Sequence, residues 1–466
     1  MPERPASEAS RLPAVAIPVM ALEHALPLLA AAIPLLGVSR FGRVLALVPL
    51  AFALVGPVVR WLRFRYTISG DVLVLEGGLL FHWRREIPFA RIQSVDSIQK
   101  LRHQVLGVVE LRVEVIGGRA TEASFPALHV QEADRIRRTV LKRAHESPEG
   151  QEPSRPHLAR LGPRALLLAG ATGGRVAVVA LLLGYVQQFL PEDIATSLID
   201  RLAHAALAVV VGVVVGALLI SVVLSLVATI VVYWNFTVRR DGDRVEITRG
   251  LLERRRAFIP LNRVQALRIQ ANPLRRMLGL ASVSAVLAGY NAQKQEGEET
   301  SMVLPIARTD ESFRIVAALL GIDGDLEGVH LERLSPRALT DRLAYAVALG
   351  AAVGGGAWAL FGPPGSWALV LIPLAAGWAW LVWHGVGYAH VGEHFVVRGG
   401  GLFRRLYVVP VANVQHLELS RSPVQRALAL ATLRLRIPKA SPGVVGIENA
   451  RAIEEFRMLS AMLHQT

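Results

Sequence analysis

The sequence predicts a multi-pass α-helical membrane protein in which six helices, arranged as three hairpins, alternate with three small α+β domains. Three observations lead to this fold class. Of the 466 residues, 52% are hydrophobic and the mean hydropathy is +0.41, which is high for a soluble chain of this length. The apolar residues gather in long stretches separated by Arg-rich segments. Those polar segments repeat one pattern three times along the chain.

The apolar stretches come in pairs, and each is long enough to cross a bilayer as a helix, for which roughly 17–25 residues are needed. The first stretch is broken by Glu23 and His24 and has no small-residue cleavage site, so we interpret it as a membrane helix and not as a cleaved signal peptide. Arg175 lies inside the third stretch, either as a functional intramembrane charge or at the interface if the helix begins near residue 174; Glu23 poses the same question. The stretches cover residues 17–37, 44–61, 166–190, 206–233, 343–362 and 367–383.

Charges at the hairpin ends predict the orientation. The connection at 191–202 carries three acids and one Arg, and the connection at 362–366 carries no charge. The opposite ends are rich in Arg, so the positive-inside rule places both termini and all three polar domains in the cytosol. The first connection, around Arg40 and Arg43, is basic and disagrees. Each return helix ends in a Trp that we expect to anchor the chain at the membrane interface: Trp61, Trp234 and Trp383.

The polar segments share landmarks at fixed spacing, which indicates an internal repeat. A Pro is followed three residues later by Arg or Asn, five residues later by Gln, and then by Gly or Ala fourteen residues after that Gln. The linkers at 157–166 and 330–339 are also near-duplicates. The landmarks are Pro88, Arg91, Gln93 and Gly107; Pro260, Arg263, Gln265 and Gly279; and Pro410, Asn413, Gln415 and Ala429.

Short runs of alternating polar and apolar residues, separated by glycines, predict antiparallel strands in each polar segment. A helical pattern ends each segment, so about 80 residues make a small β-barrel or split sandwich capped by a C-terminal helix. The expected membrane hairpins are 14–62, 164–234 and 339–385, the expected β-rich domains are 63–145, 235–321 and 386–466, and the linkers are 146–163 and 322–338.

The landmark pattern resembles that of bacterial pleckstrin-homology-like (PH-like) membrane proteins of the YdbS/YdbT type. Gly78-Leu79, Ile87-Pro88, Arg91-Ile92-Gln93 and Leu106-Gly107 carry the resemblance, together with their counterparts in the second repeat. It implies PH-like domains in a bacterial inner-membrane protein, and it suggests a role in envelope maintenance or stress without naming a reaction. The third repeat departs at Asn413 and Ala429, so a binding function of those positions would be degenerate there.

The Pro-x2-Arg-x-Gln signature has two interpretations. It could form a ligand-binding edge, or it could be structural, with Pro opening an edge strand while Arg and Gln tie down backbone; we favour the structural interpretation. Basic clusters before each Pro could contact anionic headgroups, at about 1 kcal/mol per cation near the surface, or could form solvated hairpins. These possible headgroup contacts are Arg84, Arg85, Arg254, Arg255, Arg256, Arg404 and Arg405.

Several chemistries find little support. The absence of Cys excludes disulfides and thiolate metal sites. His390-Val-Gly-Glu393-His394 spells an inverted zinc-protease signature, which needs a helix, but this segment aligns with a strand and turn of the other repeats. We therefore expect no metal and no cofactor. The net charge of +14 fits an anionic membrane surface better than nucleic acid.

Three copies of a small β-rich domain suggest recognition in place of catalysis. The sequence thus predicts a non-enzymatic membrane scaffold whose domains bind a protein partner or the anionic membrane surface. A transporter or lipid-handling protein that uses the six helices is the alternative, and an intramembrane or zinc hydrolase is more remote.

Overall fold

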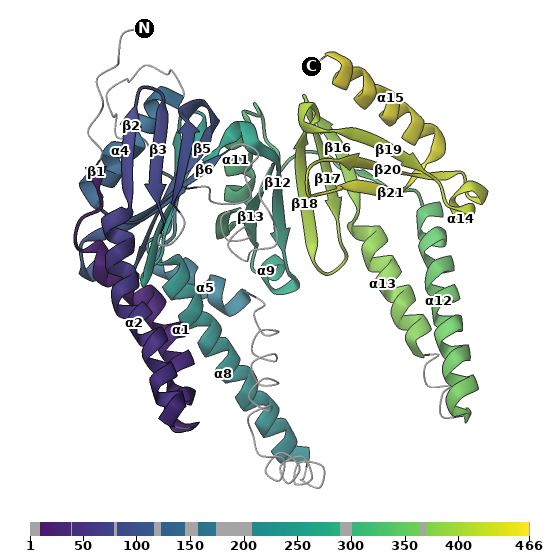
Figure 1. Ribbon diagram of the computed structural model, residues 1–466. Coiled ribbons are helices and arrows are strands. Elements are labelled where there is room, and N and C mark those ends of the chain that lie inside the picture. The colour runs from purple at the N-terminus through teal and green to yellow at the C-terminus, as the bar shows by residue number, and fades with distance from the viewer. Residues whose placement is uncertain are drawn as a thin grey trace. The chain divides into compact units, whose positions relative to one another are not determined.

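The computed structural model describes residues 10–38, 40–78, 82–115, 123–144, 157–173, 207–288, 301–363 and 370–465. It divides into two compact units, Met1–Arg160 with Trp234–Pro260, and Leu161–Tyr233 with Leu261–Thr466. Each unit is built from antiparallel sheets and helices (Figure 1). We call the three sequence repeats, each with its preceding linker, the first, second and third modules.

The first module opens the first unit with a four-stranded sheet in the order β1-β2-β3-β4. Its strands are Ser10–Arg11, Arg65–Ser69, Val72–Gly77 and Trp83–Pro88. A 3₁₀ turn, Phe89–Arg91, then leads into a second set of strands, β5 to β7 (Ile92–Lys100, Val108–Val115 and Ala123–His129). The short helix α3 (Leu101–Val105) follows β5, and α4 (Val130–Ala144) ends the module.

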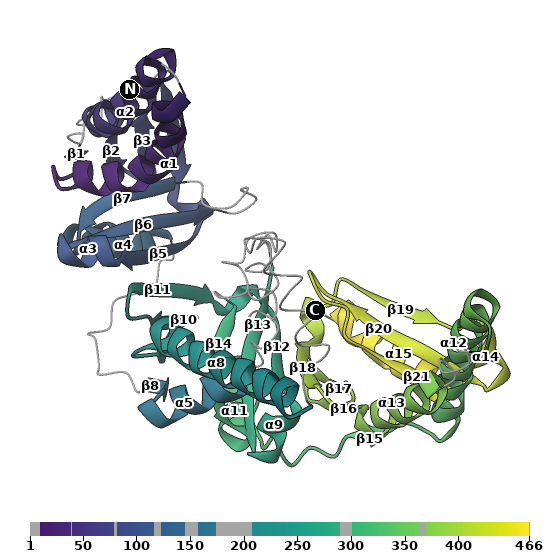
Figure 2. The same cartoon turned by 90° about the horizontal axis from the view of Figure 1, so that it is seen from below.

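The second set of strands does not close on its own module alone. It continues through β5 into four strands of the second module, giving a seven-stranded sheet in the order β7-β6-β5-β11-β10-β9-β8. Figure 2 shows β5 and β11 side by side in this sheet. The added strands are β8 (His157–Arg160), β9 (Thr237–Asp241), β10 (Arg244–Arg249) and β11 (Glu253–Pro260).

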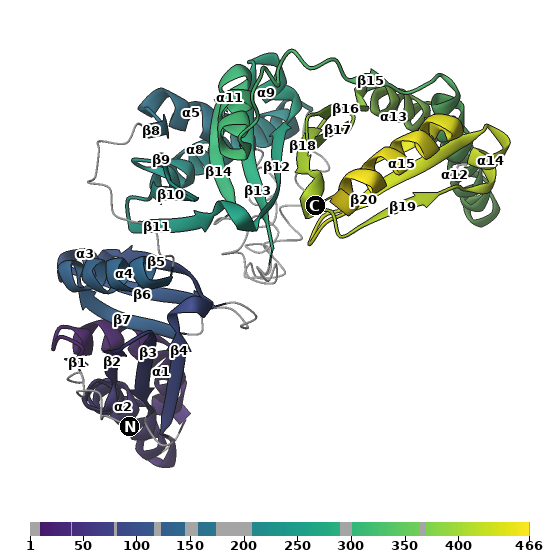
Figure 3. The same ribbon diagram turned by 90° about the horizontal axis from the view of Figure 1, so that it is seen from above.

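The second unit repeats this arrangement. Its seven-stranded sheet has the order β14-β13-β12-β18-β17-β16-β15 and joins the second module to the third (Figure 3). A three-stranded sheet, β19-β20-β21, completes the third module. The strands are β12 (Val264–Ala271), β13 (Leu280–Leu287), β14 (Met302–Arg308), β15 (Glu332–Arg333), β16 (Gly387–Val391), β17 (His394–Gly399), β18 (Arg404–Pro410), β19 (His416–Ser420), β20 (Leu430–Arg436) and β21 (Gly443–Glu448).

Short helices follow the first strand of each second set, and a longer helix ends each module. The short helices of the second and third modules are α9 (Pro273–Met277) and α14 (Pro423–Ala427), and the terminal helices are α11 (Thr309–Leu320) and α15 (Asn449–Gln465). Helix α15 packs against β19, β20 and β21, which places it across the three-stranded sheet (Figure 3).

The expected linkers are not simple connections. The ends of the two linkers form β8 and β15, and residues before the first hairpin form β1; each of these strands pairs with the first strand that follows the long helices. The duplicated linker sequences at 157–166 and 330–339 thus encode an edge strand followed by a helix start. Residues 146–156 of the first linker lie outside the described residues.

The expectation of a six-helix, multi-pass bundle is wrong. Within the described residues, two helical segments are long and apolar enough to cross a membrane, Arg43–Arg63 and Arg337–Phe361. They lie in α2 (Arg40–Arg63) and α12 (Arg337–Phe361). The sheets, with twenty-one strands, dominate the described fold instead. A transport path through six helices loses its basis with them.

Packing and length explain why the other apolar stretches differ from expectation. Helix α1 (Ala16–Val38) buries Ala16, Val19 and Met20 in the core of the first module. Its Glu23 carboxylate forms ion pairs with Lys100 at 3.6 Å and Arg102 at 3.2 Å, so Glu23 faces the β-rich domain and not a bilayer interior.

The remaining helices are short or pack on one another. Helix α5 (Pro163–Thr172) has 10 residues and α13 (Leu371–Gly385) has 15, and at about 1.5 Å per residue neither reaches the roughly 30 Å of a bilayer core. Helix α8 (Leu207–Tyr233) packs against α5, and Leu219–Tyr233 is a shorter apolar segment within it. Arg175 and the connection at 191–202 lie outside the described residues.

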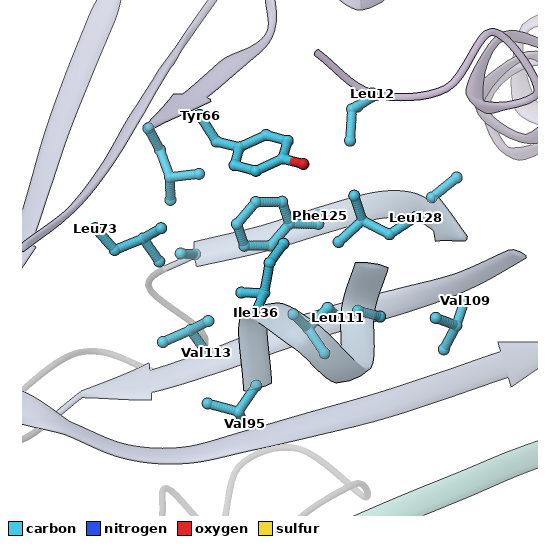
Figure 4. Close-up of a cluster of buried hydrophobic side chains, with 14 of the residues drawn as sticks. Leu12, Tyr66, Leu73, Val95, Val109, Leu111, Val113, Phe125, Leu128 and Ile136 are labelled. Atoms are coloured by element: carbon cyan, nitrogen blue, oxygen red, sulfur yellow. The ribbon is translucent and has the colours of Figure 1, made fainter. Parts of the chain in front are cut away.

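The core of the first module lies between its strands and α4. Phe125 contacts Tyr66 edge-to-face with ring centroids 5.3 Å apart, and Leu73, Leu111 and Ile136 close around them (Figure 4). Burying such side chains stabilises the fold by about 1.5–3 kcal/mol each. The third module has an equivalent core that includes Phe395, Leu433 and Leu459.

The second and third modules have a Gly ten residues before the landmark Pro, and backbone conformation explains it. Gly250 and Gly400 have φ of +107° and +95°, and a Cβ at either would collide with the carbonyl oxygen three residues on. The Gly that follows each short helix is also left-handed, with φ of +66° at Gly107 and +63° at Gly279. In the third module Ala429 adopts the same conformation with φ of +54°, which costs an L-residue energy.

We expect Ala429→Gly to stabilise the third module by about 1 kcal/mol, because Gly relieves the left-handed strain. The unfolding midpoint of the full chain in a non-ionic detergent measures this gain. The matched control is Gly279→Ala, which should lose a similar amount, since no atom lies within 4 Å of the added Cβ. Unchanged stability in both variants would contradict the explanation.

Candidate functional site: a basic pocket at a module junction

The junctions between modules use one register twice. Arg255 faces Ile98 across β11 and β5, and Arg405 faces Gln270 across β18 and β12. In both pairs the first residue stands five positions before the module's landmark Pro, and the second stands five positions after the preceding module's landmark Gln. In every residue pair of both junctions the two distances, to the Pro and from the Gln, are equal, so the two junctions are structurally equivalent.

Side chains reinforce the pairing at matching places. The Gln104 side chain donates hydrogen bonds to the carbonyls of Leu251 and Leu252, both at 3.1 Å. Arg276, which occupies the position of Gln104 in the second module, donates to the carbonyl of Gly401 at 3.5 Å. Each short helix therefore contacts the loop before the incoming strand.

The second junction encloses a cavity of about 840 Å³. Small-molecule sites usually measure about 300–1,000 Å³ and combine apolar walls with a few polar groups. This cavity has that character, with an apolar lining and a cluster of arginines. The apolar residues include Ile269, Met277, Leu280, Phe313, Leu326, Leu331, Val396 and Leu406.

Four arginines line the cavity: Arg276, Arg333, Arg398 and Arg404. Burial, followed by the neighbouring Arg276 and Arg398, lowers the pKa of Arg404, and burial with Arg333 and Arg276 lowers the pKa of Arg398. The Nε of Arg404 is buried and has no hydrogen-bond partner.

The cluster lacks acidic partners in the described part of the chain, although Glu327 also lines the cavity. Arg398 donates through Nε to the carbonyl of Gly385 at 3.0 Å, and Arg276 has its bond to Gly401. Converging cations without a carboxylate partner favour an anionic ligand.

The first junction shows that this charge arrangement is not forced by the fold. Its cavity measures about 150 Å³, and carboxylates pair with three of its four arginines. Arg137 pairs with Asp134 at 3.0 Å, and Arg256 pairs with Glu246 at 2.5 Å. The guanidinium of Arg137 also lies over the ring of Phe258, 5.1 Å from its centroid. The large cavity with unbalanced charge is therefore specific to the second junction.

The sequence signature forms the corner between the two strand sets of each module. Pro88, Pro260 and Pro410 end their strands, where the sequence favoured a Pro that opens one. A 3₁₀ turn then carries Arg91, Arg263 or Asn413 as its last residue: Phe89–Arg91, Leu261–Arg263 or Val411–Asn413.

The polar signature residues differ among the modules. Arg91 is exposed, and Gln265 is buried whereas Gln415 is exposed. Asn413 donates a hydrogen bond to the carbonyl of Val264 at 3.0 Å, across the second junction. Asn413 thus makes a contact across the junction, so this departure from the repeat pattern has a structural role in the third module. Gln93 lies in β5.

The basic clusters lie in three related strands but in different surroundings. Arg84 and Arg85 are exposed on β4, and Arg84 pairs with Glu76 at 3.0 Å and with Glu86 at 2.8 Å. Arg404 lines the large cavity, whereas its neighbour Arg405 is exposed. Arg254, Arg255 and Arg256 all lie in β11 and line the small cavity.

The exit tryptophans contact the chain itself. Trp61 donates from Nε1 to the carbonyls of Leu12 at 2.9 Å and Pro13 at 3.2 Å, and Trp383 donates to the carbonyl of Ser335 at 3.1 Å. These bonds tie α2 and α13 to the segments that precede their hairpins. Trp234 is 44% exposed.

The His390-Glu393-His394 segment forms a β-hairpin, with His390 in β16 and His394 in β17, where the zinc-protease chemistry would need a helix. His390 instead interacts with Glu455 of α15 at 2.5 Å. Within the described residues no group of three or more His, Asp or Glu side chains is placed to hold a metal.

Sequence reasoning found Arg404 but missed Arg276, Arg333 and Arg398. These residues lie outside the basic clusters before the landmark Pro residues, in a short helix and in strands. Only the pairing of β12 with β18 brings them to one cavity. The shared spacing of the landmarks was the signal available, because equal registers would have placed Arg276 beside the loop before β18.

Repeated two-sheet modules with a terminal helix, next to helices that can cross a membrane, define a membrane-associated protein built from PH-like domains. The family profile of the bacterial PH domain matches residues 19–144, 176–320 and 343–461. The chain belongs to this bacterial PH domain family.

A curated relative matches over most of the chain. The UPF0699 transmembrane protein YdbT of Bacillus subtilis (strain 168) is 25% identical over 403 residues, covering 82% of this chain and 81% of the relative. No solved structure matches the chain significantly. The recognition of the YdbS/YdbT type from the landmark residues is thereby confirmed.

The first junction contains a titratable contact that predicts a pH dependence. The Asp96 carboxyl accepts a hydrogen bond from the Phe258 backbone N–H at 3.1 Å. Burial, followed by repulsion from Glu114, raises the pKa of Asp96 to about 8 from the usual 3.8. The folded state thus holds an extra proton between these values, and its stability falls as pH rises from about 4 to 8.

We expect Asp96→Asn to remove most of this slope, because Asn keeps an acceptor for the Phe258 N–H without a charge. The variant should melt several degrees above the natural chain at pH 8, with the gap closing toward pH 4. Thermal unfolding of the full chain in detergent at several pH values measures it. Glu454→Gln on exposed α15 is the control, and equal slopes for Asp96→Asn and the natural chain would contradict the assignment.

Proposed function

We propose that this protein is a non-enzymatic, membrane-bound recognition module whose cytosolic PH-like domains bind anionic lipid at the membrane surface and dock a protein partner. The arginine cluster of the second junction is the observation that carries the proposal. Its cavity offers unbalanced positive charge beside apolar walls, which suits a headgroup phosphate with the start of an acyl chain.

Arginine supports this choice of ligand. The guanidinium is planar and stays protonated despite a lowered pKa, and it binds phosphate through paired hydrogen bonds. The buried Nε of Arg404, without a partner, supplies a donor that a phosphate oxygen would satisfy. The Arg-rich segments after the long helices support a cytosolic location of the domains through the positive-inside rule.

A titration with short-chain lipids tests the proposal. Full-length protein in a non-ionic detergent is mixed with dihexanoyl phosphatidylglycerol or with zwitterionic dihexanoyl phosphatidylcholine, and its thermal unfolding is followed. A specific ligand at 100 times its Kd stabilises the folded state by about 2.7 kcal/mol. We expect that gain with the anionic lipid and little with the zwitterionic one.

Variants assign the gain to the cavity. In the double variant Arg398→Gln with Arg404→Gln, the apparent affinity for the anionic lipid should fall at least tenfold. Each lost charged hydrogen bond costs about 1.5–3 kcal/mol. Arg405→Gln is the matched control, because Arg405 is the exposed neighbour of Arg404 on the same strand. Equal stabilisation by both lipids, or an equal loss of affinity in Arg405→Gln, would contradict the proposal.

A further inference from the structure

We propose that copies of this chain associate head to tail, by pairing β19 of one copy with β4 of the next. The contact would be a third instance of the junction that the chain already makes twice. It is independent of the lipid proposal, since it concerns sheet edges at the opposite ends of the repeat series.

The strand numbers of the sheets point to this association. The four sheets have four, seven, seven and three strands. Each seven-stranded sheet combines three strands of one module with four of the next. The first sheet is a four-stranded half without its three-stranded complement, and the last sheet is the reverse. A second copy supplies the missing half at each end.

The strands at these ends are the counterparts of those that pair inside the chain. Strand β4 corresponds to β11 and β18 by its distance from the landmark Pro, and β19 corresponds to β5 and β12 by its distance from the landmark Gln. Both lie at the edge of their sheets, β4 after β3 and β19 before β20. Among the described strands, none pairs with the outer edge of either one, and an edge strand can add a further strand there.

Exposure agrees with an uncovered edge. Five of the six residues of β4 are exposed, whereas one of the eight residues of β11 is. Strand β12 has five buried residues, whereas β19 has none. Trp83, a large side chain at the start of β4, is 39% exposed.

The common register names the residues that would meet. By the rule that holds at both internal junctions, Trp83 faces Ser420, Arg84 faces Leu419, and Arg85 faces Glu418. In the last of these pairs Arg85 lies opposite Glu418, a carboxylate that also pairs with Arg434 and Arg436 of its own module.

Charged side chains on an edge strand often protect it against unwanted pairing. That interpretation is weakened here, because β11 carries Arg254, Arg255 and Arg256 in a row and still pairs with β5. Arginine at these positions is compatible with the junction. The occupant we infer is a second copy, because this chain holds both complementary edges and joins the same strand types internally.

Cysteine cross-linking in bacterial membranes tests the inference, and the chain lacks natural Cys. Two full-length copies with different tags are co-expressed, one with Arg85→Cys and one with Glu418→Cys, and then oxidised. We expect a disulfide-linked product that carries both tags. A second pair, Arg84→Cys with Leu419→Cys, covers the alternating spacing of antiparallel partners, since only some positions suit a disulfide.

Controls make each outcome decisive. A single chain with Ile98→Cys and Arg255→Cys should form an internal disulfide, which shows that this register supports oxidation. Glu454→Cys, whose natural side chain is 69% exposed, replaces either partner as the matched surface control. The inference fails if both mixed pairs stay monomeric while the internal pair forms, if Arg85→Cys links mainly to itself, or if the products contain only other proteins.

Discussion

Backbone pairing between β5 and β11, and again between β12 and β18, is the constraint on which the rest of the structure depends. A three-strand set exposes a row of peptide groups that must find partners, and the next module provides them. Because the register repeats, α3 and α9 meet the same loop of the next module, and each junction borders a cavity. The modules are consequently not separate domains, because each seven-stranded sheet belongs to two of them.

The equivalence of the junctions makes their differences informative. At the first junction Arg137, Arg256 and Asp134 fill and neutralise the space beneath the shared strands. At the second, the arginines have no carboxylate partner among the described residues, and the cavity is more than five times larger. The two junctions thus share their backbone pairing but differ in the side chains that line their cavities.

Much of the fold could be predicted from local patterns. Alternating residues predicted the strands, and the landmark spacing predicted three copies, because Gly250 and Gly400 hold a backbone conformation that few residues adopt. Hydropathy overcounted the membrane helices, since it reads composition and not packing: Val19 and Met20 are apolar because they fill the domain core. Cavity residues such as Arg398 had no local signal, because their neighbours come from a strand in another module.

Strand pairing between modules also affects the order in which the chain can fold during synthesis. Lys100 is made about 150 residues before its partner Glu253, and at roughly 5–20 residues per second the edge of β5 waits about 8–30 s for its complement. The same delay recurs between β12 and β18. During each interval the nascent chain carries an unpaired sheet edge. Nascent chains on neighbouring ribosomes can therefore pair through these edges and aggregate. Close tethering of the growing chain to the bilayer by α2 would limit such encounters.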